Sequence, residues 1–120
     1  MRAFVDAYGI GDVDAMRAAL ADGFVGHVTN ATADVDRVDG PDAYLARVPV
    51  LAAAGATATI AQSVQVAVDQ ALTMVEIHAR RDGRVLHNFG AFLSRHDADG
   101  RVVELWMVDA QPAYSDEFWS

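Results

Sequence analysis

The pattern of hydrophobic and polar positions divides the chain into a helical first part and a strand-rich second part. In the first part, apolar residues such as Phe4 and Met16 recur at spacings of three and four, which is typical of amphipathic helices. This spacing predicts helices over residues 3–8 and 12–21. Two glycines between these segments end the first helix, and Asp12 can cap the second.

A strand, a loop and a third helix are predicted next. Residues 24–29 form a short apolar run that favours a strand, and the aspartate-rich segment 31–40 favours a loop. Pro41 suits the first turn of a helix that runs to about residue 54. Pro49 lies inside that span, so the helix is expected to kink or stop there.

The second half of the chain alternates with a period of two and contains many β-branched residues, which favours strands. An Asp-Gly pair at 82–83 marks a tight hairpin turn. Helices followed by strands predict an α+β domain, in which helices cover one face of a curved sheet. The predicted strands form an antiparallel meander over residues 57–68, 71–81, 84–95 and 101–109.

Both faces of the central strands are apolar. On the strand over 84–95, one face has Leu86, Asn88, Gly90 and Phe92, and the other has His87, Phe89, Ala91 and Leu93. A sheet with one face in water would show a polar face here. Because the helices cover only one face, we expect the other to meet a second copy in a homodimer.

Composition and charge narrow the function classes. The 120 residues are treated as one domain, 1–120, and their 52% hydrophobic content suits a packed core. The chain has no cysteine, which excludes disulfides and thiolate metal sites. A net charge of -8 argues against a nucleic-acid partner, and no basic cluster suits a membrane surface. We expect a cytoplasmic protein, because no signal pattern or membrane-spanning run is present.

Four segments resemble the NTF2-like superfamily, in particular its SnoaL-like (polyketide cyclase-like) and ketosteroid isomerase-like branches. They are GDVDAM at 11–16, LADGFVGHV at 20–28, GPDAY at 40–44 and DGRVVELWMVD at 99–109. The resemblance implies a cone, in which a strongly curved antiparallel sheet wraps around three helices and leaves an apolar pocket at its wide end. It also implies a dimer through the convex face. Such proteins include isomerases, cyclases, epoxide hydrolases, dehydratases and non-catalytic binding modules, so the site residues must decide the function.

His27 and Asp109 are the predicted catalytic residues. The resemblance places a carboxylate base at the position of His27, facing the pocket, and an imidazole can exchange protons near neutral pH. The alternative is a histidine that only hydrogen-bonds a backbone group. Asp109 shares a strand face with Leu105 and Met107, which the resemblance predicts to line the pocket. SnoaL-like cyclases use an aspartate there, and the alternative is an aspartate that caps the following turn.

Three further side chains are predicted to contact a substrate. Asn88 could donate a hydrogen bond to a substrate oxygen, and Tyr8 could bring its hydroxyl from the first helix. Phe92 would add an apolar side chain to the wall of the pocket. The tyrosine of ketosteroid isomerases falls at about Phe4, and Phe92 or Gly90 lies near the place of their second acidic donor. These mismatches argue against steroid isomerisation.

The sequence predicts no metal site and no cofactor. His78 and His87 alternate onto the other sheet face, where they could pair with Glu76 across strands or contact a second copy. No His-x-His, HExxH or facial carboxylate–histidine spacing is evident. The C-terminal segment 113–120 contains three aromatic residues, and we expect it to fold back onto a subunit.

The sequence therefore predicts a cofactor-independent isomerase, cyclase or lyase that acts on a small hydrophobic carbonyl compound. His27 would move the proton, and Asp109 would orient it or act as a second acid or base. One alternative is a non-catalytic ligand-binding or dimerisation module. Another is an epoxide-hydrolase-like enzyme, which needs an inward arginine between two aspartates, and no such arginine is evident from the pattern.

Overall fold

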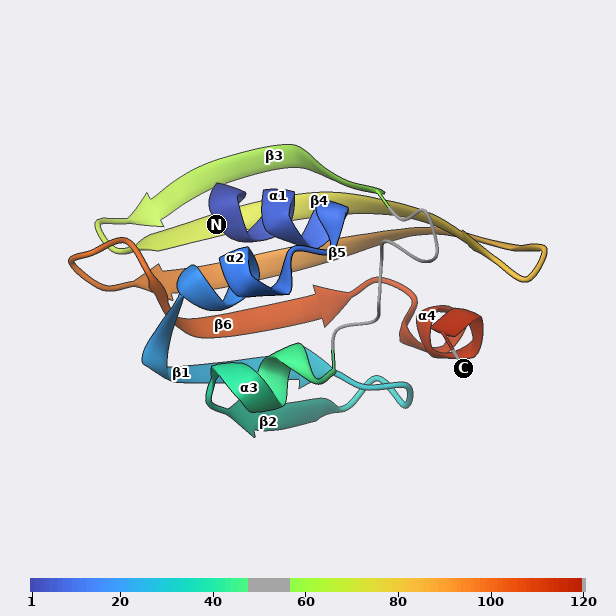
Figure 1. Ribbon diagram of the computed structural model, residues 1–120, viewed down its shortest axis with the longest axis horizontal. Coiled ribbons are helices and arrows are strands. Elements are labelled where there is room, and N and C mark those ends of the chain that lie inside the picture. Colours follow the sequence, from blue (N-terminus) through green and yellow to red (C-terminus); the bar gives the residue numbers. More distant parts are fainter. Residues whose placement is uncertain (48–56, 120) are drawn as a thin grey trace.

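The computed structural model describes residues 1–47 and 57–119 (Figure 1). Three short helices precede and interrupt the strands, and a fourth ends the chain. The elements are α1 (Arg2–Ile10), α2 (Val13–Ala18), β1 (Leu20–Thr29), β2 (Val35–Asp39), α3 (Pro41–Leu45), β3 (Thr57–Ala67), β4 (Gln70–Arg81), β5 (Arg84–His96), β6 (Val102–Asp109) and α4 (Pro112–Trp119). None of the helices in these two ranges combines the length and apolarity that a membrane span requires.

The strands form one curved sheet in the order β2-β1-β6-β5-β4-β3. Strands β3 to β6 pair antiparallel in sequence order, which confirms the predicted meander. β1 instead runs parallel to β6 and places the N-terminal strands beside the last strand of the meander. Helices α1, α2 and α3 lie over the same face of the sheet (Figure 1), so the predicted α+β architecture is confirmed.

β2 corrects the prediction of a loop over residues 31–40. It forms the edge of the sheet and pairs antiparallel with β1, so that Val38 lies opposite Gly26. Three of its five residues are charged, and Val38 alone is buried. Charged side chains suit an edge strand, because they discourage pairing with further chains. The same charges concealed the strand in the sequence pattern.

Element boundaries also differ in the first part of the chain. α2 ends at Ala18, and β1 begins at Leu20 instead of residue 24. α3 ends at Leu45, with Ala46 as its C-cap. The predicted continuation of this helix over residues 48–54 lies outside the described residues.

The core fills the space between the helices and the concave face of the sheet. Its members come from α1, α2, α3 and five strands, and include Phe4, Met16, Phe24, Tyr44 and Leu105, which are 1–6% exposed. The rings of Phe24 and Tyr44 meet edge to face, with their centroids 5.1 Å apart. Such aromatic pairs stabilise a core beyond the area that they bury.

Gly26 makes this aromatic contact possible. A Cβ atom at Gly26 would lie 3.2 Å from Cδ2 of Tyr44 and 3.3 Å from Cε1 of Phe24. These distances are shorter than ordinary van der Waals contacts of a Cβ atom, so the absence of a side chain at Gly26 lets α3 approach β1. Gly26 therefore serves the packing of the core.

The convex face of the sheet keeps an apolar patch in contact with solvent. We call the exposed side chains of Leu72, Met74, Phe89 and Val108 the convex patch; they are 41–58% exposed. Register places them on adjacent strands β4, β5 and β6. That a second copy covers this patch stays a prediction.

Substitution of Gly26 by valine should destabilise the fold by about 1–3 kcal/mol, because overpacking forces the aromatic rings apart. Gly23 offers a matched control on the same strand, since an added Cβ there meets no described atom within 4 Å. Gly23→Val should change the free energy of unfolding by less than about 0.5 kcal/mol. Urea unfolding of both variants measures the difference, and equal losses would contradict the proposed packing role.

Candidate functional site

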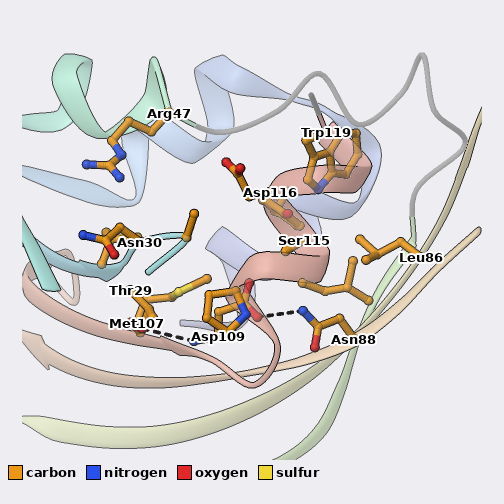
Figure 2. A pocket seen from close by; sticks show the side chains of 15 residues that line it. Thr29, Asn30, Arg47, Leu86, Asn88, Met107, Asp109, Ser115, Asp116 and Trp119 are labelled. Carbon is orange, nitrogen blue, oxygen red and sulfur yellow. Dashed lines mark hydrogen bonds between the residues drawn. The ribbon is translucent and has the colours of Figure 1, made fainter. Parts of the chain in front are cut away.

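A cavity of about 420 Å³ lies at the end of the concave face, between the sheet and α4 (Figure 2). Side chains from β1, β4, β5 and β6 line it on the sheet side, and α4 lines it on the other. The lining residues are Tyr8, Val28, Thr29, Asn30, Ala31, Arg47, Ile77, Leu86, Asn88, Met107, Asp109, Pro112, Ser115, Asp116 and Trp119.

Asp109 and Asn88 form the central polar pair of this cavity. Asn88 is 2% exposed, and its Nδ2 donates a hydrogen bond of 2.7 Å to Oδ1 of Asp109. The backbone N–H of Gln111 donates to the same oxygen at 2.8 Å. Among the described residues, no hydrogen bond reaches Oδ2 of Asp109. One oxygen is therefore held in place, and the other has lone pairs available for a ligand.

The backbone around Asp109 is also fixed. Oγ1 of Thr29 donates to the carbonyl of Met107 at 3.0 Å and accepts from the N–H of Asp109 at 3.3 Å. These contacts tie the end of β1 to the end of β6. Such supporting contacts hold a functional side chain in a defined position.

Tyr8 brings a hydroxyl from α1 to the same cavity. Burial raises the pKa of Tyr8 to about 12, and the nearby negative charge of Asp109 adds to the shift. The phenol therefore stays protonated across the physiological range. A protonated phenol can donate a hydrogen bond to an oxygen of a ligand.

Helix α4 closes one side of the cavity and is held by two arginines of the β4–β5 hairpin. Nη1 of Arg81 donates to the carbonyl of Trp119 at 2.6 Å, and Nη1 of Arg84 donates to that of Glu117 at 2.8 Å. Guanidinium groups at a helix C-terminus satisfy carbonyls that lack partners within the helix. Phe118 is 3% exposed and packs on its own chain against the hairpin. The C-terminal segment thus folds back onto its own chain, in line with the expectation that it folds back onto a subunit, and only its helical form was not predicted.

Four of the predicted site residues line the cavity: Tyr8, Asn88, Met107 and Asp109. Phe92 and Leu105 lie on the same face of the sheet but are buried in the core, 8% and 1% exposed, outside the set that lines the cavity. The core thus holds both side chains away from the cavity wall, and their contact with a substrate stays a prediction.

His27 does not face the cavity, so the prediction of its pocket position is wrong. In the parallel pairing of β1 with β6, His27 lies opposite Trp106, while Gly26 lies opposite Leu105. The imidazole consequently stands on the convex face, stacked on Trp106 with 5.3 Å between ring centroids. Its Nε2 is 2.8 Å from Oε2 of Glu104. This hydrogen bond lowers the pKa of Glu104.

Several lining residues were missed by the sequence analysis. Arg47 follows the short helix α3, and its Nη2 donates to Oδ2 of Asp36 at 2.9 Å. Asp116 and Trp119 reach the cavity because the C-terminal segment is helical. The available signal was the aromatic content of that segment, which predicted that it packs but not where.

The fold is shared with solved structures of low sequence identity. No protein-family model matches the chain, and the search of curated proteins finds no relative. The structure of Bal32a from a soil-derived mobile gene cassette aligns with a TM-score of 0.79 at 18% identity, over 99% of this chain and 92% of that one. An NTF2-like protein of unknown function from Burkholderia pseudomallei aligns with a TM-score of 0.78 at 14% identity, over 99% and 93%.

A third structure contains a ligand. RV0760c from Mycobacterium tuberculosis, in complex with estradiol-17beta-hemisuccinate, aligns with a TM-score of 0.71 at 18% identity, over 88% of this chain and 87% of that one. These similarities confirm the predicted NTF2-like fold.

The raised pKa of Tyr8 predicts a loss of stability at alkaline pH. The unfolded tyrosine ionises near pH 10, but the folded one resists ionisation until about pH 12. The contribution of Tyr8 to the free energy of unfolding is complete below pH 10 and is lost as the pH rises toward 12. The free energy of unfolding, measured with urea, should fall less between pH 7 and pH 11 in Tyr8→Phe than in the wild type. An identical fall in both proteins would contradict the raised pKa of Tyr8.

Removal of the Arg81 guanidinium should loosen α4. Arg81 is partly exposed, so we expect amide exchange in the last turn of α4 to rise about three- to tenfold in Arg81→Ala. Arg80→Ala is the matched control, because Arg80 is exposed on the other face of β4. Hydrogen–deuterium exchange measures both variants, and equal protection of α4 in the two would contradict this role for Arg81.

Proposed function

We propose that the chain binds a small, largely hydrophobic carbonyl compound in this cavity and that Asp109 exchanges a proton with it, as in a cofactor-independent isomerase or cyclase. The observation that supports this most is the Asn88–Asp109 pair, held at 2.7 Å among apolar side chains such as Ile77 and Leu86. The volume of about 420 Å³ falls in the range of about 300–1,000 Å³ that is common for small-molecule pockets.

In the proposed reaction, Oδ2 of Asp109 acts as the base. It removes a proton from the carbon next to the carbonyl, so that the C–H bond breaks, an O–H bond forms, and the electron pair moves onto the carbonyl oxygen. Return of the proton at another carbon completes an isomerisation. Asn88 positions the carboxylate by bonding the other oxygen, and Tyr8, protonated, donates to the developing oxyanion.

The charges of the cavity favour a neutral ligand. Asp109 and Asp116 both line it, and the guanidinium of Arg47 pairs with Asp36. An anionic ligand would therefore meet two carboxylates without a free positive partner among these lining residues.

RV0760c, which shares the fold, was solved with a steroid derivative. This supports a polycyclic, polyketide-like or terpenoid-like ligand for this chain.

An epoxide-hydrolase-like reaction is the second candidate, because Arg47 lines the cavity together with Asp109 and Asp116. That chemistry needs an arginine between two aspartates that activate a water molecule. Arg47 instead bonds Asp36, and Asp109 bonds Asn88. The arginine and the central aspartate thus have separate partners, which favours proton transfer without an activated water.

We also propose a homodimer through the convex face. Support comes from Leu72, Met74, Phe89 and Val108, which form one exposed apolar patch on adjacent strands. Burial of such a patch against a second copy would remove apolar surface from water.

Proton exchange on a model ketone tests the catalytic part of the proposal. With 2-tetralone in D₂O, the wild type should speed deuterium incorporation next to the carbonyl, as followed by proton NMR. Asp109→Asn should lower this rate about 10²- to 10⁴-fold, the usual contribution of a general base. Glu104→Gln is the control, because Glu104 lies on β6 but pairs with His27 on the convex face. Equal rates in the wild type and Asp109→Asn would contradict the proposed base.

Binding is followed separately by fluorescence. Trp119 lines the cavity, whereas Trp106 stacks on His27 at the convex face, so Trp106→Phe leaves a single reporter beside the ligand. Quenching of Trp119 by 2-tetralone without any exchange would favour the non-catalytic binding module. Absence of both quenching and exchange across neutral ketones of increasing size would contradict the proposed ligand class.

A further inference from the structure

A second cluster of chemically capable side chains lies on the opposite face of the sheet from the cavity. Glu76 and His78 are two residues apart on β4, so both point to the convex side. His87 lies directly across from His78 in the antiparallel pairing of β4 and β5. The metal-binding atoms of these three side chains lie within 4.8 Å of one another.

The three side chains already converge on one point. Oε1 of Glu76 is 2.8 Å from Nε2 of His78 and 2.7 Å from Nε2 of His87. The two imidazole rings stack with centroids 4.3 Å apart and an interplanar angle of 15°. Each histidine therefore presents the same ring nitrogen to the same carboxylate oxygen. One ion about 2.0–2.2 Å from each ligand atom requires only a small opening of these contacts.

The backbone beneath the cluster is regular. The pairing of β4 with β5 runs without a register shift from Gln70–Arg95 to the hairpin end at Arg81–Arg84. His87 also contacts the ring of Phe89, with 5.2 Å between the centroids. The β-hairpin thus fixes the relative positions of the ligands before any ion arrives, which lowers the entropic cost of binding.

We infer that Glu76, His78 and His87 form a binding site for a divalent transition-metal ion of the zinc class, on the convex face and separate from the cavity. Two imidazoles and one carboxylate suit zinc and its neighbours in the first transition row. Magnesium and calcium prefer sites made only of oxygen ligands. The side chains of His78 and His87 are 50% exposed. An ion can therefore enter from solvent and keep water in its remaining position.

The sequence analysis predicted that His78 and His87 could pair with Glu76 across strands, which the structure bears out, but it predicted no metal site. Glu76 and His78 show only a Glu-x-His spacing, and His87 is nine residues further along the chain. The Asp82-Gly83 turn sets the register that brings His87 across from His78. A spacing search within one strand cannot detect such a set.

Zinc titration of the metal-free full-length chain tests the inference. Isothermal titration with ZnCl₂ should show about one zinc per chain. His78→Ala and His87→Ala should each weaken binding at least about tenfold, because removal of a direct ligand costs no less than removal of a supporting contact. Glu76→Gln should weaken it in the same direction. Thermal unfolding without zinc confirms that each variant folds, as expected for half-exposed side chains.

His27→Gln is the matched control. His27 also lies on the convex face and also pairs with a glutamate, but within the described residues it has no second histidine beside it. Its loss should leave zinc affinity unchanged. NMR of the imidazole nitrogens should show zinc-dependent shifts at His78 and His87, with none at His27. Absence of zinc binding at millimolar concentration, wild-type zinc affinity in the two alanine variants, or an equal loss of affinity in His27→Gln would overturn the inference.

Discussion

The contact between Tyr44 and the bare backbone of Gly26 is the constraint on which the arrangement of the site depends. Side chains alternate between the two faces of a strand, so Gly26 against Tyr44 on the concave side goes with His27 on the convex side. Because β1 runs parallel to β6, Gly26 shares the concave side with Leu105, and His27 shares the convex side with Trp106. A shift of one residue would exchange these faces. The facing of β1 thus keeps the imidazole of His27 out of the cavity, where the polar pair comes from β5 and β6.

The same argument explains how far the sequence could predict the site. On β5, Asn88 was predicted to face the pocket, and it is buried together with Leu86, although alternation between two apolar faces does not say which face is the inner one. For β1, an inward glycine contributes no hydrophobic signal, and His27 on the other face looked equally suitable. β2 was missed because its pattern is that of a charged edge. The facing of β1 beside Tyr44 is absent from any local spacing, whereas the Asp82-Gly83 pair correctly marked the β4–β5 turn.

The two faces of the sheet have different kinds of polar pairs among the described residues. On the convex face, His27 pairs with Glu104, and His78 and His87 pair with Glu76. On the concave face, the carboxylate of Asp109 meets an amide, which cannot compete for its proton. The base that we propose in the cavity is therefore a carboxylate whose side-chain partner is an amide, beside apolar residues such as Leu86.

The β4–β5 hairpin connects these two faces mechanically. On its concave side, Arg81 holds the backbone of Trp119, and Trp119 is part of the cavity wall. On its convex side, His78 and His87 stand over the same pair of strands. A metal ion bound by both histidines, as we infer, would add a cross-strand link to the same hairpin from which Arg81 holds the C-terminal end of α4.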